Sequence, residues 1–224
     1  MKRLAYLSWL LSTCFAAAHA AEVHGEITLE ARMVRKTVPP AVYDLRGMAP
    51  HDNRALAHRS KAYDHIAVWL EGEGDSAPPT AQTMQQVDRH FEPDLLIVAP
   101  GSKVRFPNLD PVFHNIFSLS PAQPFDLGYY AEGKSREVVF SRIGIVQVYC
   151  HVHPEMYGII VVTPSRWTTQ PAADGTFSFA DVPAGNYRVA VWQRSAGVIH
   201  KKIIVPESGE VRVKFKLPDD EADR

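Results

Sequence analysis

Short stretches of alternating apolar and polar residues run through most of the chain from Val23 onward, and Gly, Pro, Asn and Asp residues separate them. Such alternation places successive side chains on opposite faces of a β-strand, and runs of about four to eight residues between turn residues are typical of all-β proteins. We therefore predict an all-β fold. Its expected strands are residues 23–29, 65–70, 95–99, 103–106, 114–118, 136–140, 144–150, 158–162, 176–179, 187–193, 199–205 and 211–217.

Two segments depart from this pattern. Residues 53–63 are the best candidate for a helix. Residues 218–224 form an acidic end with nothing to bury, and we expect this tail to be disordered.

The start of the chain has the features of an export signal. Lys2 and Arg3 precede a mainly apolar stretch, residues 4–18, and Ala18-His19-Ala20 is a small-residue cleavage pattern. We expect cleavage near Ala20, which leaves a periplasmic or secreted protein with no membrane span in the mature chain.

Two other interpretations of this start fit the sequence less well. Cys14 suggests a lipoprotein, but Thr13 is a poor residue before a lipidated cysteine and the apolar run continues beyond it. An uncleaved anchor helix needs about 18 to 20 apolar residues, and this run is shorter.

Composition and charge narrow the class of protein. A chain of 224 residues that is 46% hydrophobic and 22% charged is neither disordered nor a multi-spanning membrane protein. Cleavage of residues 1–20 leaves 22 basic and 25 acidic residues, so the formal charge changes from −1 to −3. This balance argues against nucleic acid as a partner. Residues 31–62 are locally basic, which fits either a solvated loop or a segment that attracts an acidic partner.

The two cysteines, Cys14 and Cys150, differ in their expected fate. If residues 1–20 are removed, one thiol reaches an oxidising compartment, where it has no internal partner for a disulfide. Cys150 therefore needs another role, either as a metal ligand or as a buried side chain.

The residues near Cys150 supply one set of ligand types. His153 and Met156 follow Cys150 within seven residues, and His114 lies on a distant predicted strand. A thiolate, two imidazoles and a weak thioether are the ligands of a mononuclear blue-copper site, with His, Cys and His in one plane and Met axial. Zinc also accepts Cys and His, but it would leave the Met unused, and structural zinc sites prefer four strong ligands.

The C-x-x-H-x-x-M spacing resembles the short ligand loop of amicyanin, and the surrounding segment resembles the cupredoxins. The features that carry the resemblance are Val98-Ala99-Pro100-Gly101-Ser102-Lys103-Val104-Arg105-Phe106-Pro107-Asn108, the pair His114-Asn115, Phe125-Asp126-Leu127-Gly128, Gly133-Lys134-Ser135 and the Tyr149-Cys150 strand end. The resemblance implies a Greek-key β-sandwich with one type 1 copper held by His114, Cys150, His153 and Met156. It also implies that Asn115 hydrogen-bonds across to the cysteine loop and helps to lock the site.

A second resemblance concerns the segments that flank this unit. Residues 174–189 resemble the second half of the carboxypeptidase-regulatory-like (transthyretin-like) β-sandwich, and residues 23–27 and 66–72 fit its first half. Either terminal segment would have only a thin core if it folded by itself, which favours one small sandwich built from both chain ends. Independent β units in series remain an alternative. The expected organisation is a signal peptide (1–20), a first sandwich part (21–78) with the basic loop, a cupredoxin domain (79–163), a second sandwich part (164–217) and the acidic tail (218–224).

Other polar residues are open to more than one interpretation. His151 adjoins Cys150 and should point to the other side of the strand, so it fits a surface or partner-facing role better than a bridge to a second copper. His51, His58 and His65 are either a second metal group or scattered loop residues. Glu155 stands where an apolar residue is common in the amicyanin loop, which leaves the docking partner open.

These observations predict a function without catalysis. The sequence has no G-x-S-x-G, Walker-type, dinucleotide or H-E-x-x-H motif, so we expect no enzyme. The resemblance implies one-electron transfer between a redox donor and a redox acceptor protein. The alternatives are copper tolerance, storage or delivery, and a structural or adhesion role with a vestigial site.

Overall fold

A computed structural model describes residues 20–30, 63–72 and 76–219, and all regular structure in these ranges is β. The predicted all-β fold is confirmed. Within these ranges no helix is long and apolar enough to cross a bilayer.

Two sheets enclose the core around Cys150. The first has the order β10-β7-β3, and the second, five-stranded sheet has the order β6-β12-β11-β8-β9. A short β4–β5 hairpin lies at their end, beside β7 and β12. The bounds are β3 Ala81–Thr83, β4 Gln85–Val87, β5 His90–Glu92, β6 Leu95–Val98, β7 Ser102–Pro107, β8 His114–Ser118, β9 Phe125–Tyr130, β10 Ser135–Phe140, β11 Gly144–Cys150 and β12 Tyr157–Val162.

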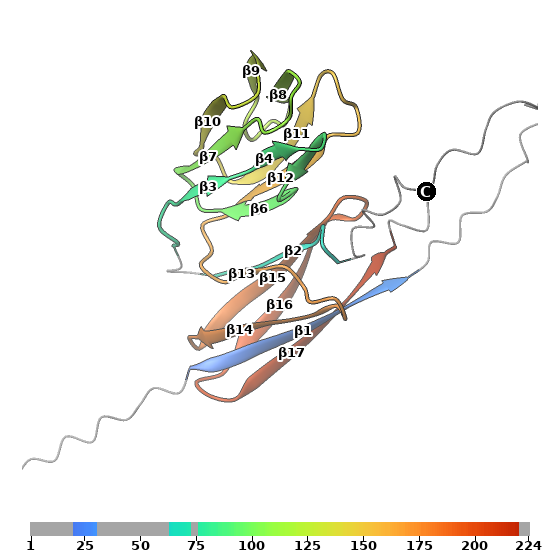
Figure 1. The fold of residues 1–224 in the computed structure, drawn as a ribbon. Coiled ribbons are helices and arrows are strands. Elements are labelled where there is room, and N and C mark those ends of the chain that lie inside the picture. Colours follow the sequence, from blue (N-terminus) through green and yellow to red (C-terminus); the bar gives the residue numbers. More distant parts are fainter. Residues whose placement is uncertain (1–19, 31–62, 73–75, 220–224) are drawn as a thin grey trace, which may run out of the picture.

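Two further sheets contain strands from both ends of the chain. β1 lies between β14 and β17, pairing antiparallel with the former and parallel with the latter, and the other sheet has the order β13-β2-β15-β16 (Figure 1). Alternate residues of these strands share one core, in which Val23 and Phe215 are almost fully buried. The bounds are β1 Ala21–Glu30, β2 Ala67–Glu71, β13 Thr168–Thr169, β14 Thr176–Val182, β15 Gly185–Gln193, β16 Gly197–Val205 and β17 Glu210–Pro218.

The two sheet pairs meet face to face, so the four sheets stack in layers (Figure 1). In β12, Ile160 faces the core around Cys150, whereas Ile159 and Val161 face a third apolar cluster with Trp69 and Trp192. Successive side chains of a strand point to opposite faces, so one strand can serve two cores. At the margin of this contact, the His65 ring lies 2.5 Å from the Asp94 carboxylate.

All twelve predicted strands are present, with boundaries that differ by a few residues. The prediction missed β3, β4, β5 and β13 because two or three residues are too few to show alternation. It also missed β9, where Gly128 has a positive φ of 66° and interrupts the pattern.

The predicted helix and the predicted disordered tail lie mostly outside the described ranges. The predicted helix lies outside them except for its last residue, Tyr63, which is in a turn. Of the predicted disordered tail, Pro218 belongs to β17 and the Asp219 N–H donates to the Glu30 carbonyl at 3.0 Å, whereas residues 220–224 lie outside the described ranges.

Candidate metal centre

The register of two neighbouring strands brings a histidine to the side of Cys150. Cys150, the last residue of β11, stands opposite Ile116 of β8. His114 begins β8 two residues earlier, so its side chain lies on the same face as that of Ile116. His153 follows in the loop that joins β11 to β12, and this loop returns it to the same end of the sheet.

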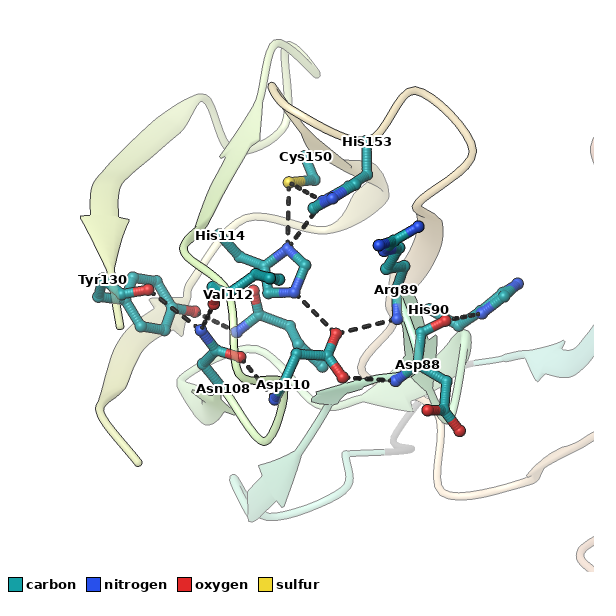
Figure 2. Close-up of polar contacts among 11 residues, drawn as sticks. Asp88, Arg89, His90, Asn108, Asp110, Val112, His114, Tyr130, Cys150 and His153 are labelled. Atoms are coloured by element: carbon teal, nitrogen blue, oxygen red, sulfur yellow. Dashed lines mark hydrogen bonds and ion pairs between the residues drawn. The ribbon is translucent and has the colours of Figure 1, made fainter. Parts of the chain in front are cut away.

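Three potential ligand atoms converge at this end (Figure 2). The Cys150 Sγ lies 3.6 Å from His114 Nδ1 and 3.7 Å from His153 Nδ1, and the two nitrogens are 3.0 Å apart. Cys150 and His114 are buried, whereas His153 is half-buried. Among the described residues, this is the one cluster of His, Cys, Asp or Glu that is compact enough to hold a metal.

The size of this triangle fits a metal ion. A point equidistant from the three atoms lies in their plane, about 2.0 Å from each, and protein metal sites have metal–nitrogen distances of about 2.0–2.1 Å and metal–sulfur distances near 2.3 Å. The donor set of one soft sulfur and two imidazole nitrogens suits a transition metal.

The outer nitrogen of His114 is held by a residue that the sequence did not single out. Its Nε2 lies 2.8 Å from Oδ2 of Asp110, and both side chains are buried. An ionised carboxylate only accepts hydrogen bonds, so this contact requires a proton on Nε2, and it leaves Nδ1 as the nitrogen that faces Cys150 and His153. The only signal in the sequence was a carboxylate four residues before the histidine.

Backbone groups surround the Asp110 carboxylate. It accepts the N–H of Asp88 at 2.6 Å and that of Arg89 at 2.9 Å. Burial by itself would raise the pKa of Asp110, but the Arg89 N–H, the His114 ring and the Asp88 N–H together hold this pKa below its usual value. The carboxylate is therefore ionised at neutral pH.

His153 is favoured in its neutral form. Burial lowers the pKa of its ring, and the neighbouring His114 lowers it further, while Glu155 acts in the opposite direction. A neutral imidazole is the form that binds a metal.

The structure places Met156 and Asn115 close to the cluster in the fold. Met156 is fully buried in the same core as Cys150, and its N–H donates to the His153 carbonyl at 3.0 Å. The Asn115 side-chain amide donates to Asp126 at 2.6 Å, and its carbonyl oxygen is buried without a hydrogen-bond partner in the described structure. The observed partner of Asn115 is thus a β9 carboxylate, rather than the cysteine loop that the resemblance implies.

Two other candidate histidines, His65 and His151, lie in the described part of the chain, and neither belongs to the cluster. His151 is exposed, and its ring packs edge-on against Phe117 with the centroids 4.0 Å apart. His65 contacts Asp94, whereas His51 and His58 lie outside the described residues, so the suggested second metal group stays a prediction.

Exposed apolar side chains occur in the loops that carry the two histidines. Phe113, which precedes His114, is 62% exposed, and Val152, which precedes His153, is 46% exposed. Leu109 is also exposed. This end of the sandwich therefore presents apolar surface beside the half-buried His153.

The Asp126 contact gives a testable pH dependence. The Gly128 N–H and then the Asn115 amide lower the pKa of Asp126 from its usual 3.8. A carboxyl with a depressed folded-state pKa stabilises the fold above its unfolded-state pKa, and this contribution is lost as the pH falls through the folded-state value. Asp126→Ala should thus lower the urea midpoint of the metal-free protein at pH 7. The difference from the unsubstituted protein should shrink toward pH 3, and a difference that is independent of pH would refute this assignment.

Comparison with known proteins returns solved structures only. No protein-family model matches the chain. No curated protein sequence matches it either. A purple cupredoxin from Nitrosopumilus maritimus is 26% identical over 36% of this chain and 98% of its own, with a TM-score of 0.34. A mutant of amicyanin in its reduced Cu(I) form is 18% identical over 43% of this chain and 98% of its own, with a TM-score of 0.36.

An enzyme is also among the similar structures. A copper-containing nitrite reductase from Thermus scotoductus SA-01 is 24% identical over 42% of this chain, with a TM-score of 0.36. The match spans 25% of the length of that reductase.

Proposed function

We propose that this protein binds one type 1 copper ion and transfers single electrons between redox partners. The observation that carries the proposal is the triangle of Cys150 Sγ and the two Nδ1 atoms, whose size suits a bound metal ion. In this proposal His114, Cys150 and His153 hold the copper, and the buried Met156 supplies a weak fourth ligand. Copper supplies a one-electron couple between Cu(I) and Cu(II).

The role of the surrounding protein is to keep the ligands in one arrangement. His114 and Cys150 lie on paired strands whose inner faces belong to a packed core, and Asp110 fixes the His114 ring. Closely packed interiors resist displacement, so the ligands move little when the charge at the site changes. Small rearrangement favours rapid electron transfer.

The half-buried edge of His153 is the proposed electron port. Exposed Phe113 and Val152 stand beside it and offer apolar area to a redox partner, while Glu155 adds one negative charge. We propose a donor and an acceptor protein rather than a chemical substrate, and hence no enzymatic activity. Export to the periplasm, where a free thiol benefits from a bound metal, belongs to the same proposal.

The domain organisation is proposed on the strand pairing. Residues 79–163 form the cupredoxin domain, and residues 21–78 and 164–217 form one carboxypeptidase-regulatory-like sandwich. The pairing of β1 with β14 and β17, and of β2 with β15, supports this division.

The visible spectrum tests the proposal. The protein without residues 1–20 is purified free of metal, mixed with one equivalent of Cu(II), and examined before and after reduction. We expect an intense band in the orange-red region that disappears on reduction. A colourless complex that binds Cu(I) and releases it readily would instead indicate storage or delivery, and binding of zinc alone would overturn the proposal.

A further inference from the structure

The turn between β4 and β5 has an unusual backbone conformation for its residues. Its central residues Asp88 and Arg89 have φ angles of 51° and 59°. Two-residue turns of this kind favour Asn-Gly or Asp-Gly, because a side chain such as that of Arg is disfavoured at positive φ. Residues persist in such conformations where the surrounding structure holds them, often at functional sites.

The turn directs two backbone N–H groups at one buried carboxylate (Figure 2). Asp110 receives the Asp88 N–H on Oδ1, and it receives the Arg89 N–H and the His114 Nε2–H on Oδ2. The Asp110 N–H itself donates to Asn108 Oδ1 at 2.9 Å, which fixes the loop from behind. Asp110 is 5% exposed and His114 is fully buried, so water screens the contact between them little.

We propose that Asp110 is a positioning residue that keeps His114 in the Nε2–H form and sets the reduction potential of the copper site through its negative charge. This inference rests on the proposed function. A carboxylate that accepts the outer N–H of a ligating histidine fixes the ring and makes its other nitrogen a stronger donor. A stronger donor beside a buried negative charge stabilises Cu(II) more than Cu(I), which lowers the potential. The β4–β5 turn holds this carboxylate in place through its two backbone N–H groups.

Two matched substitutions test this role. Asp110→Asn removes the buried charge and gives the turn N–H groups one acceptor oxygen fewer. Glu92→Gln removes an exposed carboxylate from β5 of the same hairpin, where the side chain accepts a hydrogen bond from Gln85 and takes no part in the contacts of Asp110. We expect Asp110→Asn to weaken Cu(II) binding by about 10- to 100-fold, with a smaller effect on Cu(I). Each tenfold loss of Cu(II) affinity relative to Cu(I) raises the potential by about 59 mV. Glu92→Gln should leave the Cu(II) affinity and the potential near those of the unsubstituted protein.

A measurement on the metal-free protein separates this inference from the proposed function. The ¹⁵N resonances of the imidazole report which nitrogen carries the proton, and we expect His114 in the unsubstituted protein to be protonated at Nε2 alone. A proton at Nδ1 would overturn the inference even if Asp110→Asn fails to fold, and so would equal potentials in a folded Asp110→Asn and in Glu92→Gln. Absence of the orange-red absorption band from the unsubstituted protein would overturn the proposed function. The tautomer of His114 in the metal-free protein could still be determined from the ¹⁵N resonances.

Discussion

Replacement of Cys150 by serine is expected to abolish the intense visible band that the proposed function predicts for the copper-loaded protein. The band requires a thiolate ligand, and a serine hydroxyl stays protonated at neutral pH and is a poor ligand for copper. Because Cys150 is 4% exposed and its serine replacement is similar in size, we expect the fold to persist with a loss of about 1–3 kcal/mol for the buried hydroxyl. Titration with Cu(II), followed by absorption and calorimetry, measures the loss.

The neighbouring histidine provides the control. His151 is exposed and packs on Phe117 outside the cluster, so His151→Ala should keep the band and the affinity. If His151→Ala lost the band while Cys150→Ser retained it, the ligand assignment would be wrong. A loss in both variants with an unchanged circular dichroism spectrum would place His151 in the site as well.

Truncation of Trp192 to alanine is expected to cause the largest loss of stability among single substitutions at the contact between the sheet pairs. Trp192 is 4% exposed and packs in the apolar cluster with Trp69, Leu95 and Ile159. A buried tryptophan replaced by alanine loses about 3–5 kcal/mol, which includes the cavity left behind. Urea unfolding of the metal-free protein, monitored by circular dichroism, measures the change.

An exposed apolar residue of the same sheet provides the control, because its replacement removes apolar atoms that are not buried. Ile204 of β16 lies on the same face as Trp192 by register, but it is 76% exposed. Ile204→Ala should change the free energy of unfolding by no more than about 0.5 kcal/mol. Similar losses in the two variants would show that the contact between the sheet pairs contributes little.

The strands were predictable where the alternation was long, and the candidate ligands were predictable where their spacing was local. Cys150, His153 and Met156 lie within seven consecutive residues, so their combined chemistry can be read directly from the sequence. The closeness of His114 depends on the pairing of β8 with β11, for which the sequence offered only the resemblance.

Asp110 shows why the rest of the site was not predictable. Its importance depends on two backbone N–H groups from the β4–β5 turn, twenty-one and twenty-two residues earlier. Backbone donors leave no trace in side-chain identity, and both strands of that hairpin are too short for their alternation to be seen. The partner of Asn115 was missed for a related reason, because Asp126 belongs to β9, a strand that the pattern did not indicate.

Strand β12 also determines how the ligand loop can open. It begins directly after Met156, and its alternate residues belong to two different apolar cores. Regions that open locally have few buried contacts, whereas strands central to a core exchange their amide hydrogens only when the whole unit opens. The amides of Ile159 to Val162 should therefore be among the slowest to exchange in the molecule. The carboxyl end of the loop between β11 and β12 is thus tied to a slowly opening unit, and we expect faster amide exchange in its exposed part, where Glu155 lies.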